Sequence, residues 1–151
     1  MTYEHSGPDA QLAADRTTIE AIVATFFAAF ATGPDLDARL AALRDLFLPE
    51  AVIVRTCGLD PAVYSVEAFI EPRRALLAGG SVVGFREWAT DGRTEVFGDI
   101  AHWFGGYAKA WTQDGVQHTG GGMKSIQLVR MPVGWRVSAA AWDDERPGVT
   151  I

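Results

Sequence analysis

The spacing of apolar residues divides the chain into a helical first half and a stranded second half. Near the N-terminus, apolar residues recur three or four positions apart, which predicts one buried stripe of a helix. The stripe consists of Ile19, Ile22, Val23, Phe26 and Phe30. Thr17 and Glu20 have the spacing of a capping box, although Asp9 could begin the helix earlier. The pair Gly33-Pro34 predicts its end.

Two more helices and a short strand are predicted in the first half. A second helix is indicated from Asp35 to Pro49 by apolar residues at helical spacing. These are Leu36, Leu40, Leu43 and Phe47. The β-branched segment 51–56 predicts a strand. Ser65 is expected to cap a third helix over 66–80, which Pro72 would kink or divide and two glycines would end.

From Val82 onward apolar residues tend to recur at every second position, which predicts strands. Turn-forming residues divide this half at Gly98-Asp99, Asp114-Gly115 and Pro132-Val133-Gly134. The expected antiparallel strands are 83–97, 100–113, 116–131 and 135–145, and residues 90–93 form either a bulge or another turn. Helices followed by a meander predict an α+β fold, with N-terminal helices packed on one curved, mostly antiparallel sheet. We expect one domain over 9–148, preceded by a flexible arm over 1–8.

Composition narrows the possible partners. The chain has 151 residues, 48% of them hydrophobic, and a formal net charge of -6. An acidic chain without a basic cluster is not expected to bind nucleic acid or an anionic membrane. The single cysteine, Cys57, excludes an internal disulfide, and the three histidines lack metal-ligand spacing, so no metal site is expected. Without a secretory signal or a spanning apolar run, we expect a cytoplasmic protein.

Several segments resemble a known superfamily. "LFLPEAVIV" (46–54) is similar to its junction of second helix and first strand, and "FIEPRRALLAGG" (69–80) to its proline-interrupted third helix. "EVFGDIAHWFGGY" (95–107) and "GMKSIQLVRMPVGWRVSAAAWDDERPG" (122–148) resemble its sheet. The family is the nuclear-transport-factor-2-like (NTF2-like) superfamily, in particular a largely uncharacterised SnoaL-like bacterial subfamily. The resemblance covers about residues 17–148.

The resemblance implies a cone-shaped, cystatin-like fold with a ligand pocket between the concave sheet and the helices. It also implies a homodimer formed across the convex sheet face, and it suggests no cofactor. Members of the superfamily include isomerases, dehydratases, cyclases and epoxide hydrolases, and others only bind or assemble. Fold alone therefore does not determine the function.

The predicted hairpins place His102 in a polar row. With two-residue turns, Glu95, His102 and Gln127 lie opposite one another on three strands, and Ser125 lies diagonal to His102. Opposed Cβ atoms are about 4.5–5.5 Å apart, so a hydrogen bond from the imidazole to the Glu95 carboxylate could orient His102 as a general base. The alternative, a structural histidine satisfied by a neighbour, stays open. A one-residue slip in either hairpin would move the row to the other face.

Strand alternation gives two faces of different character. Phe104, Ser125 and Gln127 share the His102 face, which Ala139 and Ala141 join if residues 132–134 form a three-residue loop. The other face combines aromatic side chains with lysines: Trp103, Tyr107, Trp111, Lys109 and Lys124. Because alanines leave room for a ligand, we expect the His102 face to be concave and to line the pocket. The Trp103 face would then be convex and form the dimer interface.

Other polar residues are weaker candidates. Arg55 and Tyr64 lie near the expected pocket mouth, and Glu87 and Trp88 lie on the first long strand; each could equally be an ordinary packing or surface residue. The acidic segment 142–146 is interpreted as a solvated strand end. Strand spacing places Asp143 about 16 Å from His102, which excludes a dyad between them.

The sequence thus supports two functions. The first is a cofactor-independent cyclase, isomerase or dehydratase acting on a small, apolar, oxygen-bearing molecule. In it His102 would move a proton, Glu95 would orient His102, and Gln127 or Ser125 would hold a substrate oxygen. The second is a non-catalytic ligand-binding or dimeric association domain.

Overall fold

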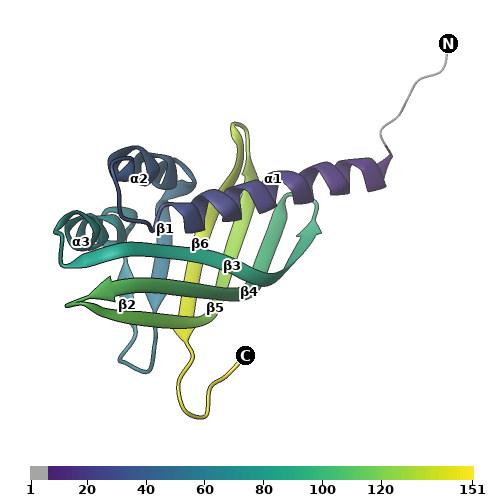
Figure 1. Ribbon diagram of the computed structural model, residues 1–151. Coiled ribbons are helices and arrows are strands. Elements are labelled where there is room, and N and C mark those ends of the chain that lie inside the picture. Colours follow the sequence, from purple (N-terminus) through teal and green to yellow (C-terminus); the bar gives the residue numbers. More distant parts are fainter. Residues whose placement is uncertain (1–6) are drawn as a thin grey trace.

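Helices and a curved sheet form two layers, as the α+β prediction requires. The computed structural model describes residues 7–151. In chain order the elements are α1 Pro8–Ala28, α2 Leu36–Asp45, β1 Phe47–Arg55, β2 Ala62–Tyr64, α3 Val66–Ala78, β3 Val82–Phe97, β4 Ile100–Gln113, β5 Val116–Met131 and β6 Gly134–Asp144 (Figure 1). The sheet order is β2-β1-β6-β5-β4-β3; within the described residues, β1 and β6 pair in parallel and the other neighbours antiparallel.

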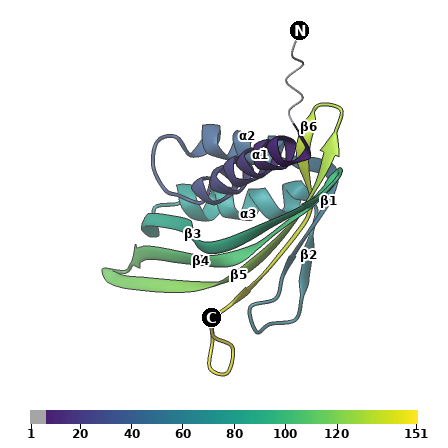
Figure 2. The ribbon, with the colours of Figure 1, turned by 90° about the vertical axis from the view of Figure 1, so that its right-hand side faces the viewer.

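The three helices lie on the concave side of the sheet. Figure 2 shows α1, α2 and α3 together on that side, while the convex side carries no helix among the described residues. We call these the helix-covered face and the helix-free face. The fold prediction is therefore confirmed, including the packing of N-terminal helices on one mostly antiparallel sheet.

The helix boundaries correct the sequence prediction at several points. α1 begins at Pro8, where the missing N–H of proline costs nothing, and the Thr17 hydroxyl donates to the Ala13 carbonyl in mid-helix (3.0 Å). The predicted capping box is therefore wrong. Phe47 pairs with Val137 as the first residue of β1 and is not part of α2. Residues 1–6 of the predicted arm lie outside the described residues.

α3 remains one helix although it contains a proline. It runs unbroken through Pro72, so the predicted alternative of a separate turn is wrong. The Ala68 amide donates to the Ser65 hydroxyl, 3.2 Å, which confirms Ser65 as the N-cap. The absent N–H of Pro72 removes one helical hydrogen bond, and apolar burial of Phe69 and Ile70 offsets that loss.

The four long strands are confirmed, with one turn different from the prediction. Residues 90–93 form a bulge, because the pairing of β3 with β4 shifts between Ala89 and Gly92. The last hairpin has a two-residue turn, since Met131 pairs with Gly134, and the predicted three-residue loop is wrong. The pairing of β5 with β6 also shifts between Gln127 and Leu128, and this shift restores the predicted pairing of Gln127 with Ala139. The short strand β2 was not predicted.

The helix-covered face is the aromatic one. Trp103, Tyr107, Ile126 and Leu128 are buried there, and the Trp103 ring meets that of Phe27 on α1 edge-on at 5.7 Å. The prediction that the Trp103 face is convex is therefore wrong, and so is the prediction that the His102 face is concave. Large aromatic side chains gain far more from burial than alanines do, so the helices cover the Trp103 face.

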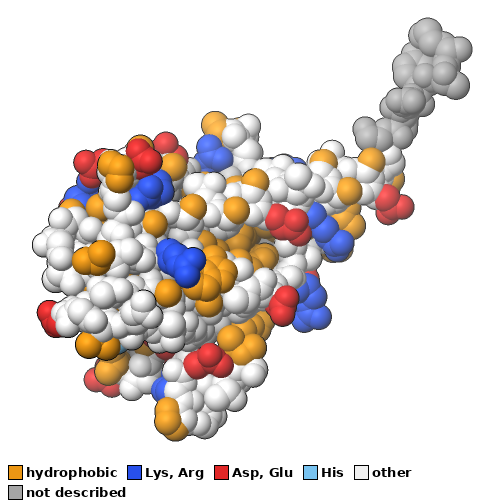
Figure 3. Space-filling model, viewed as in Figure 1, with side chains coloured by type: hydrophobic (Ala, Val, Ile, Leu, Met, Phe, Trp, Pro, Cys, Tyr) orange, Lys and Arg blue, Asp and Glu red, His pale blue; other side chains and the backbone are white. Residues whose placement is uncertain are grey.

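The outer surface carries mixed charge. Acidic and basic side chains are interspersed over the side of the molecule drawn in Figure 3, including the region of α2. Arg44 and Glu67 form one such surface pair between α2 and α3. Within residues 7–151, no helix is long and apolar enough to cross a membrane.

Candidate functional site

A cavity of about 490 Å³ lies between α3 and the helix-covered face of the sheet. Its walls are largely apolar, from residues such as Phe69, Leu77, Phe85 and Trp111. Its polar side chains are Arg55, Tyr64, Arg73, Glu87, Tyr107, Lys109, Gln113 and Lys124. Apolar walls with a few convergent polar groups are typical of small-molecule sites, and the volume falls in their usual range of about 300–1,000 Å³.

Strand pairing brings the polar side chains into adjacent rows. Glu87 on β3 lies opposite Lys109 on β4. One row further along the sheet, Tyr107 lies opposite Gly122. Lys124 lies opposite Trp142 on β6, and Trp142 lies opposite Arg55 on β1. Because side chains alternate between the faces, residues two apart on each strand project into the same cavity.

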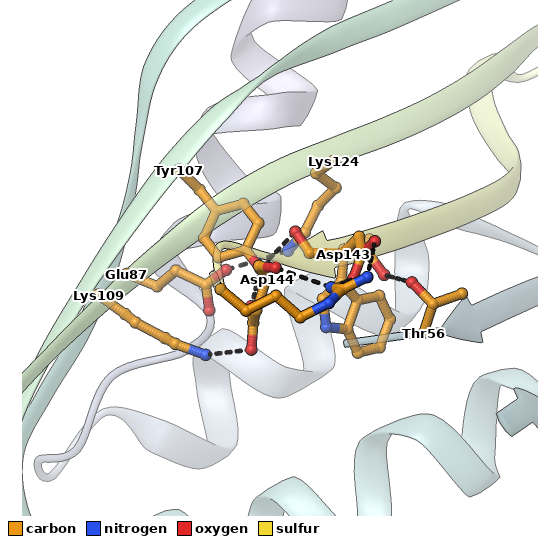
Figure 4. A network of polar contacts seen from close by, with 9 residues as sticks. Thr56, Glu87, Tyr107, Lys109, Lys124, Asp143 and Asp144 are labelled. Atoms are coloured by element: carbon orange, nitrogen blue, oxygen red, sulfur yellow. Dashed lines mark hydrogen bonds and ion pairs between the residues drawn. The ribbon is translucent and has the colours of Figure 1, made fainter. Parts of the chain in front are cut away.

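Lys124 and Glu87 form a buried ion pair in the cavity wall. The Lys124 Nζ lies 3.1 Å from the Glu87 Oε1, and the two side chains are only 4% and 11% exposed (Figure 4). Five aromatic ring centroids also lie 4.5–5.6 Å from the ammonium: those of Phe26, Phe27, Phe30, Tyr107 and Trp142. Burial lowers the pKa of Lys124, while the Glu87 carboxylate acts in the opposite direction. The ring faces also favour the ammonium.

Asp144 connects Tyr107 and Lys109 beside this pair. The Tyr107 hydroxyl donates to one Asp144 oxygen, and the Lys109 Nζ lies 3.1 Å from the other (Figure 4). Burial opposes ionisation of Asp144, but the Tyr107 hydroxyl and the Lys109 ammonium outweigh it and lower the pKa of this carboxyl. Burial and the Asp144 charge raise the pKa of Tyr107, so the phenol keeps its proton. The interpretation of segment 142–146 as a solvated strand end is therefore wrong for Asp144.

The glycine run in β5 makes room for this network. A Cβ atom on Gly122 would lie 2.7 Å from the Tyr107 hydroxyl and 2.1 Å from the Asp143 carbonyl oxygen. Both distances are shorter than a non-bonded contact of a Cβ atom allows, so this position does not accept a residue with a side chain. The glycines thus allow close approach of Tyr107 to Asp144.

The predicted binding residues are divided between the two faces. Arg55, Tyr64 and Glu87 line the helix-covered cavity. Trp88, next to Glu87, points to the helix-free face, where the Arg86 guanidinium lies 4.8 Å from its ring centroid. Sequence reasoning therefore placed three of the cavity's polar residues among its candidates.

The predicted row of His102 exists, but it lies on the helix-free face. Glu95 pairs with His102 and His102 with Gln127. The His102 Nε2 and the Ser125 hydroxyl share a hydrogen bond at 2.8 Å, while the Glu95 carboxylate, 64% exposed, approaches the Arg93 Nε at 3.3 Å. Ser125 thus takes the partner role predicted for Glu95. Catalysis by His102 stays a prediction.

His102 lines one hollow on that face, and its neighbours Phe104 and Ser125 line another. One of about 570 Å³ is lined by Glu95, His102, Ser125, Gln127 and the small Ala139 and Ala141. Phe104, whose ring stacks on His102 at 6.0 Å, borders a second hollow of about 320 Å³ with the C-terminal residues 149–151. Alanines do leave room beside His102, as predicted, but no helix among the described residues covers it.

Sequence reasoning missed Arg73, Tyr107, Lys109, Lys124 and Asp144 as site residues. One signal in the sequence could have located this site. Lys124 lies two residues from Ile126 and therefore on the same face of β5. A lysine that shares a strand face with large apolar residues is placed where helices must cover it. Its charge then needs a buried partner.

Solved structures with the same architecture are known, although neither a protein-family model nor a curated protein sequence matches the chain. An NTF2-like protein with a cystatin-like fold from Novosphingobium aromaticivorans is 19% identical, with a TM-score of 0.71 over 95% of this chain and 90% of that one. An NTF2-like superfamily protein from Salmonella enterica is 14% identical, with a TM-score of 0.69 over 91% and 94%. The chain has the NTF2-like fold.

One catalytic protein shares this NTF2-like architecture. A hexachlorocyclohexane dehydrochlorinase, LinA type 2, is 12% identical, with a TM-score of 0.72 over 91% of this chain and 90% of that one. Such low identities establish the fold alone. Among residues 7–151, no three His, Cys, Asp or Glu side chains gather as a metal site would require.

Proposed function

We propose that the protein binds a small, mostly apolar, oxygen-bearing molecule in the helix-covered cavity and acts on it by acid–base chemistry without a cofactor. The reaction would be of the isomerase, cyclase or dehydratase type. The observation that carries the proposal is the Glu87–Lys124 ion pair in the wall of an apolar cavity. The dehydrochlorinase with this fold supports a catalytic function.

The ion pair supplies a base and an acid side by side. The Glu87 carboxylate would take a proton from a carbon next to a carbonyl group, and the electron pair would move onto the carbonyl oxygen. The Lys124 ammonium or the Tyr107 phenol would stabilise that oxygen as it gains charge. Return of the proton from Glu87 to a different carbon would complete an isomerisation.

Energetics also support a functional role for the pair. A buried ion pair seldom stabilises a fold more than apolar residues of similar volume would, because both charges lose their hydration. Lys124 sits among five aromatic rings, where an apolar side chain would pack without that cost. Chemistry in the cavity explains why the position carries a lysine.

The proposal is tested by proton exchange with solvent. Apolar ketones and cyclic enones are incubated with the protein in D2O, and deuterium uptake at carbon is followed by mass spectrometry. We expect uptake with the wild type and a loss of about 100-fold or more in Glu87→Gln, with the fold retained by circular dichroism. Undiminished uptake in Glu87→Gln, or none with any compound, would overturn the proposal.

A second candidate function is homodimerisation across the convex sheet face, which is the helix-free face. The expected interface on the Trp103 face is wrong, because that face is buried under the helices. The helix-free face instead exposes Phe97, at 84%, together with Ile100 and Phe104. Exposed apolar side chains that lie close together favour a protein contact. A cytoplasmic location likewise remains a prediction.

A further inference from the structure

The helix-covered cavity has a charge opposite to that of the chain. Among the described residues, four cationic side chains line it, Arg55, Arg73, Lys109 and Lys124, against the one carboxylate of Glu87. The chain as a whole has a formal net charge of -6. Positive charge is thus concentrated in an apolar cavity, where low-dielectric walls strengthen its field.

Within the described part of the chain, two of these cations have carboxylate partners and the other two have none. Lys124 pairs with Glu87 and Lys109 with Asp144, each at 3.1 Å. Among residues 7–151, no carboxylate oxygen lies within 4.0 Å of a guanidinium nitrogen of Arg55 or Arg73.

The hydrogen bonds of both arginines leave donors free. Arg55 donates from Nη2 to the Asp60 carbonyl at 3.1 Å, and its buried Nε has no hydrogen-bond partner among residues 7–151. Arg73 donates from Nη1 to the Phe69 carbonyl at 2.8 Å. A buried donor without a partner is costly, so an acceptor supplied by a ligand would be favourable.

Arg55 and Arg73 both line the cavity and both neighbour Trp142. Arg55, at the end of β1, lies opposite Trp142 in the sheet. Arg73, on α3, has its guanidinium carbon 5.2 Å from the Trp142 ring centroid and 4.1 Å from that of Phe69. Stacking on two rings holds the planar guanidinium in place.

We infer that the ligand is an apolar carboxylate whose carboxylate group binds between Arg55 and Arg73. A carboxylate has two oxygens, which match the paired donors of a guanidinium. The apolar part of the ligand would lie against Leu77, Phe85 and Trp111, within reach of Glu87. This inference rests on the proposed function and names its substrate class.

The test compares acids with their neutral amides. The probes are benzoate with benzamide, naphthoate with naphthamide, and hexanoate with hexanamide, each titrated to about 1 mM by calorimetry. For at least one pair we expect the acid to bind about tenfold or more tightly than the amide. The preference should fall below about threefold in Arg55→Gln and Arg73→Gln.

Arg74→Gln is the matched control. Arg74 is the next residue on α3, but it pairs with Asp37 and Glu71 and does not line the cavity. The variant removes the same charge, so the preference should remain. If Arg73→Gln does not fold by circular dichroism, Arg55→Gln carries the test.

Equal binding of acid and amide in every pair would overturn this inference and leave the proposed function standing. So would a loss of preference in Arg74→Gln as large as in Arg55→Gln. No binding of any probe would also overturn it. The deuterium-exchange assay, which uses neutral ketones, decides the acid–base proposal separately.

Discussion

The two faces of the sheet each carry a glutamate beside a basic residue, yet their surroundings differ greatly. Glu87 and Lys124 lie under the helices, 11% and 4% exposed, with aromatic rings around the ammonium. Glu95 lies opposite His102 on the helix-free face and is 64% exposed. In a low dielectric the interaction of charges is stronger and unpaired charges are costly. Coverage by helices, rather than residue type, makes the first pair suited to acid–base chemistry.

The largest expected effect follows from breaking the buried pair. Lys124→Met leaves Glu87 charged without its partner and should lower the free energy of unfolding by about 3–5 kcal/mol. Replacing both residues, with Glu87→Gln added, should recover most of that loss. Urea denaturation of the wild type and of the two variants measures these values.

The Glu95 carboxylate on the helix-free face should contribute much less to stability than the buried pair. Glu95→Gln removes an exposed carboxylate whose partner, Arg93, is also exposed, so stability should change by less than about 0.5 kcal/mol. Equal losses in Glu95→Gln and Lys124→Met would contradict the difference drawn between the two faces.

A smaller effect is expected where α1 is fixed to the sheet. Buried Asp15 accepts hydrogen bonds from two Arg130 nitrogens, each at 2.8 Å, and from the Trp135 indole at 3.4 Å. Asp15→Asn should lower the free energy of unfolding by about 2–3 kcal/mol. Asp99→Asn, which alters an exposed partner of the same arginine, should cost less than about 1 kcal/mol. Thermal unfolding of both variants provides the comparison.

The same contact predicts a dependence on pH. The Arg130 guanidinium lowers the pKa of Asp15 from 3.8 to about 2. Because the folded-state pKa is below the unfolded one, this stabilisation is complete above about pH 3.8 and is lost as the pH falls toward about 2. Acid titration of Asp15→Asn should lack this component, and an unchanged acid transition would count against the contact.

The smallest effect on folding, but a clear one on assembly, is expected on the helix-free face. Phe97→Glu replaces a side chain that is already exposed, so stability should change by less than about 0.5 kcal/mol. If two copies associate through this face, the charge should convert a dimer to a monomer. Light scattering after size-exclusion chromatography measures the mass. A monomeric wild type would end the dimer proposal.

Sequence reasoning succeeded where local rules decide the structure. Turn residues at 98–99 and 114–115 set the register, so the pairing of Glu95, His102 and Gln127 was predicted correctly. The pairing of Gln127 with Ala139 was also correct, although a shorter turn and a bulge produce it. Such features depend on residues that are close together in the chain.

The choice of face failed because it depends on distant contacts. Helices from the first 78 residues cover whichever face offers more apolar area, and that comparison requires summing burial over both faces. The prediction treated the alanines of the His102 face as room for a ligand. It overlooked Trp103, Ile126 and Leu128 on the other face, whose burial stabilises the fold more than burial of alanines would. The ion pair of Lys124 with Glu87 links β5 to β3 across β4, and its burial depends on which face the helices cover.

The central claim is that ligand binds on the helix-covered face, and side-chain NMR during a ligand titration tests it most directly. The Trp111 indole lines the helix-covered cavity, and the His102 imidazole lines the helix-free hollow. With naphthoate as probe, or the tightest acid from the calorimetry, we predict a saturating shift of the Trp111 indole signal and a constant His102 signal. A saturating shift of His102 with a constant Trp111 signal would contradict the account.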